Sequence, residues 1–332
     1  MSELKNTICA KTIQFGKCRV EDDLCQVRHC LNPNTVFSTQ GESVIQEKPD
    51  KQIDEIRFTV LRVQSPVSYW TQIHQPGANQ PEVSQDQILL QLSLALYYSK
   101  PKNRIIESVN NLKVGELVCV KGKDDNYERA KITFVHKVCL LGTELVEKVE
   151  VQYLETGENT TLGKTSIYRL ADQFKEVPPL AQLVVLAGYK PPDKDENWST
   201  DCINHIQRSV IPPFLCAKDD YYECRGKILL RSPEIIWIAG CEVWEVCRTR
   251  LTYNLEIGEE IISTKTGVRN KEHYLQIRRL GEEVGLEPTP LLRKLSLHPG
   301  TGYTNLLDSQ PTQLAKLLDQ IGLKFFRKAK VT

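Results

Sequence analysis

The sequence predicts a mainly β fold with some helices, divided into more than one folding unit. Two runs that largely alternate apolar and polar residues, 56–63 and 67–73, predict a pair of strands joined by a turn at Ser65-Pro66. Four or five further short strands between 114 and 169 predict a small barrel. The length of 332 residues exceeds what one small core usually contains, which favours two or more units.

The remaining elements follow from helical spacing and from the residues that start and stop helices. In the first expected helix, Ser84 or Asp86 is the N-cap and Pro101 is the stop. After Gly285 the chain has many helix breakers, then a short amphipathic stretch, TQLAKLLDQIG, and a basic end. By these criteria we expect helices at 82–99, 199–210 and 271–284, and strands at 181–186, 222–230 and 233–245.

Composition and charge narrow the class of protein. Lys plus Arg is 43 and Asp plus Glu is 42, so no global field attracts a polyanion and any nucleic-acid contact must be local. The N-terminal Met1-Ser2-Glu3-Leu4-Lys5 is polar from the start, unlike a signal peptide, and the longest apolar stretch, 88–98, is too short to span a bilayer. We therefore expect a cytoplasmic protein with reduced cysteines and no membrane contact.

Three cysteines and a histidine near the N-terminus have the spacing of a zinc site, Cys9-x8-Cys18-x6-Cys25-x3-His29. Three thiolates and one imidazole complete a tetrahedral shell around Zn2+, which makes a structural site without an open position for catalysis. The few apolar side chains of this stretch cannot form a core of their own, so metal binding would supply the folding free energy. We expect structural Zn2+ as the cofactor of a unit comprising residues 1–34.

This arrangement resembles the CCCH-type zinc fingers, many of which bind RNA. It departs from them in the second gap, which has six residues where the commonest family pattern has five. Cys30 could also compete with His29 as a ligand. The alternative interpretation is a set of reduced surface cysteines in a frayed N-terminus.

RNA-binding fingers of this type use aromatic stacking and basic side chains. The acidic run Glu21-Asp22-Asp23 opposes such contacts here, so a structural or protein-docking finger is a second reading beside contact with single-stranded RNA. The candidate RNA contacts are Phe15, Lys17, Arg19 and Arg28.

The stretch from Leu112 to Pro192 resembles the Tudor domain within extended Tudor modules. The matching motifs are a Tyr-x-Arg-Ala strand at 127–130, a central strand that ends in the turn Glu155-Thr156-Gly157, and a long exit to Pro178-Pro179. In such modules, strands before the Tudor core and strands and helices after it form a staphylococcal-nuclease-like (SN-like) half.

The resemblance implies a fold class and a division of the chain. The fold is mainly β with α: a small Tudor barrel joined to an SN-like, OB-type β-barrel with helices, plus the small N-terminal zinc finger. The expected extended Tudor module covers 56–285, with a linker at 35–55 before it and a tail at 286–332 after it. Within the module, the Tudor core is 112–172 and the SN-like parts are 56–111 and 190–285.

A CCCH finger followed by an extended Tudor module resembles the C-terminal part of the Yb-like, helicase-type Tudor proteins of the germline piRNA pathway. No helicase motif is evident in this sequence. The resemblance implies a non-enzymatic adaptor of RNA-mediated silencing, in the cytoplasm or in perinuclear germ granules. Its expected partner is the tail of a Piwi-type protein or another germline granule protein. The alternative is an RNA-binding protein in which the finger contacts RNA and the Tudor module recruits a partner.

Tudor domains of this kind hold symmetric dimethylarginine in an aromatic cage, by stacking and cation–π attraction. Carried onto this sequence, the cage positions are Tyr127, Glu128, Tyr153, Thr156 and Glu158. At most one or two aromatic walls survive, and the two glutamates could instead pair with an unmodified arginine. We expect a docking surface with weak or absent methylarginine dependence. The alternative is that both tyrosines are ordinary barrel-wall residues.

Two features that could suggest nucleotide binding or nuclease activity do not meet the requirements of either. The near-match Gly157-x5-Gly163-Lys164-Thr165 is one residue too long for a phosphate-binding loop and sits between strands. A nuclease needs clustered carboxylates and a metal, and the flanking strands show no such cluster. The histidines at 74, 136, 205, 273 and 298 lie far apart with no obvious catalytic partner.

Overall fold

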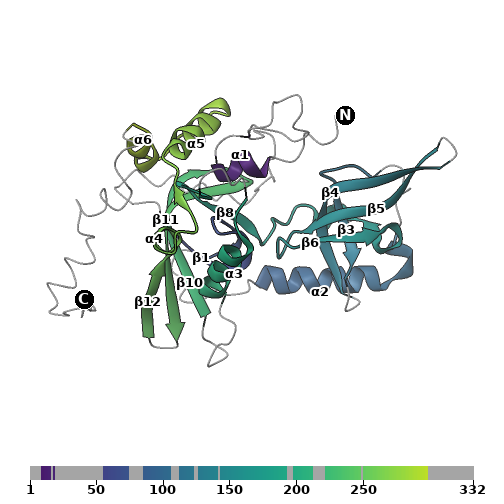
Figure 1. Ribbon diagram of the computed structural model, residues 1–332. Helices are drawn as coiled ribbons and strands as arrows, with labels where there is room; N and C mark the ends of the chain where they lie inside the picture. Colours follow the sequence, from purple (N-terminus) through teal and green to yellow (C-terminus); the bar gives the residue numbers. More distant parts are fainter. Residues whose placement is uncertain are drawn as a thin grey trace.

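The computed structural model describes residues 9–15, 18, 55–74, 85–105, 112–122, 126–140, 143–192, 197–211, 221–247 and 250–297. These residues form two β units joined by one long helix, as Figure 1 shows. Among them, no helix is long and apolar enough to cross a membrane.

The larger unit, for which we keep the expected name SN-like barrel, is built from strands on both sides of the segment 112–172. Its sheet has the order β10-β1-β2-β8-β11-β12, and an additional pairing of β10 with β11 closes five of the strands into a ring. The pair β8–β11 is parallel and the others are antiparallel. The strands are β1 (Glu55–Ser65), β2 (Ser68–Ile73), β8 (Gln182–Leu186), β10 (Tyr221–Arg231), β11 (Ile235–Cys247) and β12 (Arg250–Glu256).

Two apolar clusters cover the two faces of the central strands. Val184 and Leu186 of β8 point to the cluster that includes α3, while Leu183 and Val185 point to the cluster that includes α5. Because both faces are covered, β8 reads in sequence as a continuous apolar run. The surrounding elements are α1 (Ala10–Phe15), α3 (Thr200–Val210), α4 (Ile257–Ser263), α5 (Glu272–Glu283), α6 (Pro290–Leu297) and the short pair β9 (Tyr189–Lys190) and β13 (Val268–Arg269).

The smaller unit, which we call the small barrel, is a five-stranded antiparallel sheet curled around its own core. The strand order is β6-β5-β4-β3-β7, and the core includes Val118, Ile132, Val149 and Ile167. Its elements are β3 (Leu117–Lys121), β4 (Tyr127–Leu140), β5 (Thr143–Tyr153), β6 (Asn159–Gly163), β7 (Ile167–Arg169) and the 3-10 turns at Lys164–Ser166 and Asp172–Phe174.

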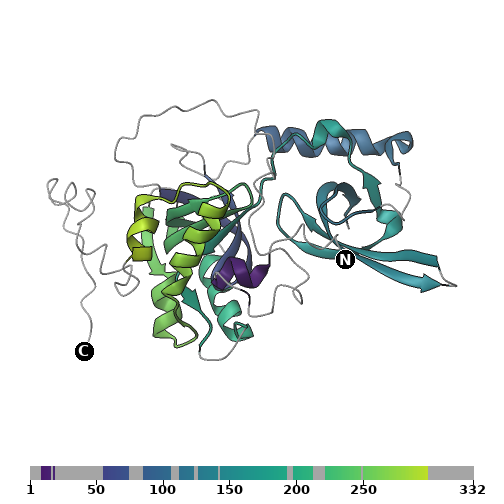
Figure 2. The ribbon, with the colours of Figure 1, turned by 90° about the horizontal axis from the view of Figure 1, so that it is seen from above.

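The connecting helix α2 (Gln85–Ser99) packs along the outside of the small barrel and is followed by a 3-10 turn at Pro101–Asn103. Its inner face carries Leu90, Leu94 and Tyr98, which are buried against Phe174 and Leu170 of the exit segment. Seen from above in Figure 2, α2 runs along the outer edge of the small barrel.

The expected strands and helices form close to their expected positions. The expected helix at 82–99 is described over Gln85–Ser99, and the stop at Pro101 is confirmed. Ser199 caps α3 by accepting a hydrogen bond from the Cys202 N–H at 3.2 Å. Strand β12 and helices α4 and α6 were not expected. The amphipathic stretch of the tail lies outside the described residues.

Candidate peptide-binding site

One buried arginine fixes the central turn of the small barrel to its exit segment. Arg129 on β4 is 1% exposed, and its Nε donates to Oε1 of Glu155 at 2.7 Å. The other Glu155 oxygen accepts from the Leu180 N–H at 3.1 Å. Burying a charge is costly unless it is paired and hydrogen-bonded, and here every side of the guanidinium has an acceptor. Its remaining N–H groups donate to the carbonyls of Phe174, Val177 and Pro178.

The turn after β5 lies directly against the SN-like barrel. Gly157 has φ +70°, and a Cβ at this position would lie 2.1 Å from Cγ of Trp70. Nη1 of Arg62 donates to the Gly157 carbonyl at 3.0 Å. The turn therefore needs glycine both for its backbone conformation and for its contact with the tryptophan. This contact holds the expected binding turn at the junction of the two barrels.

Three of the predicted contact residues meet at one end of the small barrel. Desolvation, and then the charges of Glu128 and Glu158, raise the pKa of the Tyr153 phenol. Tyr153 lies opposite Ala130 in the sheet, and Glu128 is two residues away on the same face of β4. We call Glu128, Tyr153 and Glu158 the acidic end.

Two backbone hydrogen bonds shape the turn of the acidic end. The Tyr153 N–H donates to the Glu158 carbonyl at 2.8 Å, and the Gly157 N–H donates to the Tyr153 carbonyl at 2.9 Å. The exposed Thr156 is within the turn, where its hydroxyl accepts from the Glu158 N–H at 3.3 Å. Thr156 thus stabilises the turn locally, and it cannot supply the flat apolar wall that an aromatic residue would.

Tyr127 lies apart from the acidic end, although it is the neighbour of Glu128. Side chains alternate along a strand, so Tyr127 faces α2, where it is 8% exposed. Its ring stacks on Tyr98 with centroids 5.5 Å apart, and Cζ of Arg104 lies 5.7 Å from its centroid. This placement fits the alternative reading of Tyr127 as a barrel-wall residue.

The described part of the expected zinc finger packs on the SN-like barrel. The carbonyl of Ile13 in α1 accepts from Nε1 of Trp237 at 3.2 Å and lies 3.2 Å from Nε2 of His273. Ile13 and Phe15 join the two barrel clusters. This differs from the expectation that the stretch depends on metal alone for its folding, because the barrel supplies an apolar surface for it.

The four expected zinc ligands are divided between described and undescribed residues. Cys9 is buried and Cys18 is half-buried, while Cys25 and His29 lie outside the described residues. Within the described chain, no group of three His, Cys, Asp or Glu residues could hold a metal ion. Zinc binding stays a prediction.

The possible RNA contacts are placed only at Phe15. Its ring packs against the SN-like core and is partly buried there, which leaves less of it for stacking on a base. Lys17, Arg19 and Arg28 lie outside the described residues. RNA binding by this segment therefore also stays a prediction.

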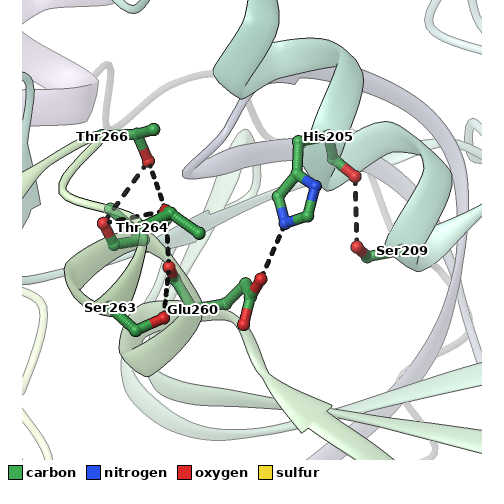
Figure 3. Close-up of polar contacts among 7 residues, drawn as sticks. His205, Ser209, Glu260, Ser263, Thr264 and Thr266 are labelled. Atoms are coloured by element: carbon green, nitrogen blue, oxygen red, sulfur yellow. Dashed lines mark hydrogen bonds and ion pairs between the residues drawn. The ribbon is translucent and has the colours of Figure 1, made fainter.

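The structure gives three of the histidines a glutamate partner that the sequence did not reveal. The pairs are His74–Glu223, His136–Glu150 and His205–Glu260. In Figure 3, Nε2 of His205 lies 2.7 Å from Oε1 of Glu260, and the nearby Ser209 hydroxyl donates to the backbone carbonyl of His205 at 3.1 Å. A nucleophilic serine would instead donate to the imidazole. This cluster joins α3 to α4, and its geometry gives Ser209 no activating base.

Sequence reasoning missed the contribution of the SN-like barrel to this site. Trp70 and Arg62 both touch the turn at Gly157, yet they precede it by about ninety residues in the chain. The available signal was Gly157 itself. A glycine in a turn indicates that another part of the chain can approach the backbone closely, but it does not identify that part.

One segment of the chain matches a known protein family. Residues 50–188 match the family model described as "Tudor domain". Over 286 residues the chain is 19% identical to the human protein named "Putative ATP-dependent RNA helicase TDRD12". That alignment covers 83% of this chain and 21% of the relative, so this chain spans about a fifth of the relative's length.

Three solved extended Tudor domains are similar in fold. The human TDRD1 domain, in complex with a symmetrically dimethylated peptide, is 19% identical with a TM-score of 0.47, covering 65% of this chain and 90% of that chain. The Drosophila melanogaster Papi domain is 16% identical with a TM-score of 0.48, covering 65% and 98%. The mouse TDRD1 domain TD3, with a MILI peptide containing dimethylarginine 45, is 16% identical with a TM-score of 0.45, covering 66% and 96%.

At these identities and TM-scores, the structural likenesses carry no argument about function, and the Tudor assignment rests on the family match. This chain is therefore similar to the Tudor family over residues 50–188.

Proposed function

We propose that this chain is a non-enzymatic adaptor whose Tudor domain docks an arginine-containing segment of a partner protein at the acidic end. The observation that carries this proposal is the placement of two glutamates beside one tyrosine: Glu128 shares a face of the sheet with Tyr153, and the Tyr153 N–H donates to the Glu158 carbonyl across the turn. The Tudor match at 50–188 supports a docking role, and the contact of Gly157 with Trp70 supports a rigid mounting for the site.

The chemistry of the acidic end favours an unmodified guanidinium. Carboxylates form charge-assisted, often bidentate hydrogen bonds with arginine N–H groups. Methylation keeps the charge but blocks some of these donors. One tyrosine contributes about 0.5–2 kcal/mol of cation–π attraction, which is less than a closed aromatic box would give. We therefore expect binding to be insensitive to methylation, or weakened by it.

For the partner we propose the arginine-rich tail of a Piwi-type protein, or another germline granule protein with such a segment. Support comes from relatives: the mouse TDRD1 domain was solved with a MILI peptide, and a variant of the Drosophila Papi domain with a Piwi N-terminal peptide. On this basis we place the chain in piRNA silencing, in the cytoplasm or in perinuclear germ granules. The helicase activity in the human relative's name is not carried over.

Calorimetric titration of the full chain with Arg-Gly-rich Piwi tail peptides tests the proposal. We expect the unmodified peptide to bind at least as tightly as the symmetrically dimethylated one. Glu158→Gln and Glu128→Gln should each weaken binding about threefold to tenfold, up to about 1.4 kcal/mol. Glu147→Gln is the matched control, because this exposed glutamate lies on β5 but away from the acidic end.

Two results would contradict the proposal. Tenfold tighter binding of the dimethylated peptide would show that a methylarginine cage exists. Binding of neither peptide would remove the docking role at this site, and would shift weight to the alternative in which residues 1–34 bind RNA.

A further inference from the structure

Helix α2 exposes a second apolar stripe on the face opposite to the one that packs on the small barrel. The exposed fractions are 48% for Ile88, 58% for Leu89, 62% for Leu92 and 68% for Leu96. These are four of the nine large apolar side chains that are exposed in the described chain. Exposed apolar patches of this kind mark interaction surfaces.

Helical geometry explains why α2 has two such stripes. At 3.6 residues per turn, Leu90, Leu94 and Tyr98 fall on one side and are buried, while Ile88, Leu92 and Leu96 fall on the other. A helix that is apolar on both sides is normally covered on both sides. In Figures 1 and 2, the small barrel covers one side of α2, and no described element covers the other.

The stripe carries no charge of its own. Its exposed neighbours are Gln91, Ser93 and Ala95, and the only charged residue in the helix sequence is Asp86. A helix face that meets only water usually carries lysine or glutamate. A neutral stripe is suited to an equally neutral surface, because no charge is then left without a partner.

The spacing of the stripe is symmetric about Leu92. Ile88 lies four residues before it and Leu96 four residues after it, while Leu89 and the small Ala95 lie three residues before and after. An antiparallel pair of such helices with its twofold axis at Leu92 sets each Ile88 against Leu96 of the other copy. It also sets each bulky Leu89 against a small Ala95. A twofold interface requires this kind of self-complementary pattern.

We propose that α2 is a self-association surface, through which two copies of this chain pair their helices antiparallel about Leu92. This inference is independent of the peptide-docking proposal. Antiparallel pairing sets the opposed ends of the helix dipoles together. It also separates the basic cluster after the helix, Lys100, Lys102 and Arg104, from the same cluster of the second copy. A parallel pair would bring the two clusters together.

The amphipathic stretch of the C-terminal tail is the competing occupant. The described chain ends in α6, which Figure 1 shows on the far side of the SN-like barrel from α2. A second copy of the chain needs apolar residues spaced symmetrically about Leu92, and no other occupant does.

Sedimentation velocity of the full chain at about 1, 10 and 100 µM tests self-association. One pair of four-turn helices is a small interface, so we expect a dissociation constant on the order of 10–100 µM. Leu92→Glu should keep the chain monomeric throughout, because two carboxylates would meet on the twofold axis. Leu297→Glu is the matched control: this leucine of α6 is 66% exposed, and its substitution should leave self-association unchanged.

A mixed pair tests the register. Leu92→Lys alone should also be monomeric, whereas an equimolar mixture of Leu92→Glu and Leu92→Lys should associate, because opposite charges then face each other. A mixture that stays monomeric overturns the antiparallel register.

Two further outcomes overturn self-association itself. One is a full chain that is monomeric at about 100 µM. The other is a Leu92→Glu variant that associates like the unsubstituted chain. If the full chain is monomeric, a lower free energy of unfolding for Leu92→Glu but not for Leu297→Glu would show that the stripe is covered within one chain.

Discussion

Arg129 shows how one side chain can determine the stability of the small barrel. Its guanidinium, 1% exposed, binds Glu155 and three carbonyls of the exit segment. Arg129→Met would leave a half-buried carboxylate and the carbonyls without their donor. Breaking a buried pair in this way costs about 3–5 kcal/mol. We expect a loss of this size in the free energy of unfolding, measured by urea denaturation.

Arg293→Met is the control for this prediction. Arg293 is also paired with a glutamate, at 3.9 Å, but its side chain is 54% exposed. Surface pairs contribute about 0–1 kcal/mol, so this substitution should change stability little. Equal effects of the two substitutions would show that the buried pair does not anchor the exit segment.

Alanine substitutions at three glycines separate the cost of backbone strain from the cost of a steric clash. Gly157→Ala meets both a φ of +70° and the Trp70 ring, so we expect a loss of about 2–4 kcal/mol. Gly285 has φ +74° but nothing within 4 Å, so Gly285→Ala should cost only about 1 kcal/mol. Gly163 has neither feature, and Gly163→Ala should be nearly neutral.

Chemical denaturation of the three variants measures these differences. If Gly157→Ala and Gly285→Ala lower the free energy of unfolding equally, the Trp70 ring moves away without penalty, and the contact between the barrels adds no stability.

At the scale of elements, His273 of α5 holds α1 in place and makes the contact sensitive to pH. Nδ1 accepts from the Gly188 N–H at 3.3 Å, and Nε2 lies 3.2 Å from the Ile13 carbonyl. A neutral ring with its proton on Nε2 satisfies both contacts. Burial lowers the pKa of His273 to about 4, from an ordinary value of 6.5.

This lowered pKa predicts a loss of stability in acid. The folded state favours the neutral ring, so this stabilisation is complete above pH 6.5. Between pH 6.5 and 4 the unfolded chain binds a proton at His273 and the folded chain does not, so the stabilisation is lost as the pH falls through this range. The loss should approach about 3 kcal/mol. The free energy of unfolding between pH 7.5 and 4.5 measures it.

Two variants isolate the histidine from other titrating groups. His273→Gln should flatten this part of the pH dependence, whereas His205→Gln, at a ring that is 48% exposed, should leave it unchanged. An unchanged profile for His273→Gln would contradict the assignment.

Elements with a clear pattern could be predicted from sequence. The apolar run of β8 and the capped start of α3 were both visible as local signals. Strand β12 was missed because five of its seven residues are exposed, so it shows no alternation of burial. The sequence does not distinguish the exposed stripe of α2 from its buried face, since a low-charge helix does not reveal which side is buried.

Within the candidate site, the sequence alignment placed Glu128, Tyr153 and Glu158 together, and they lie at the same end of the small barrel. The alignment also assigned Tyr127 to this site. Neighbouring side chains in a strand point to opposite faces, so Tyr127 faces α2 while Glu128 faces the site. Trp70 could not be predicted, since only the closed fold brings it to Gly157.

At the scale of the whole molecule, the SN-like barrel depends on two segments separated by the Tudor core. Strands β1 and β2 lie between β10 and β8, so a fragment of residues 182–297 should not close the ring. All four tryptophans lie outside residues 85–181, so their fluorescence reports only the SN-like barrel. Adding a peptide of residues 55–74 should restore a buried emission from Trp237.

The matching control is the same peptide with Phe58→Asp, because Phe58 is 0% exposed in the barrel core. It should not restore the emission. Closure of residues 182–297 without any peptide would show that β1 and β2 are dispensable.

The split construction of the SN-like barrel has a consequence for synthesis on the ribosome. The two strands made first, β1 and β2, gain their final neighbours only after more than one hundred further residues have been translated. During that interval their edges are open, and an open edge can pair with a neighbouring nascent chain. The small barrel has all its strands within one continuous segment and can fold meanwhile. Among the described strands, the order of translation therefore leaves this hairpin longest without its final neighbours.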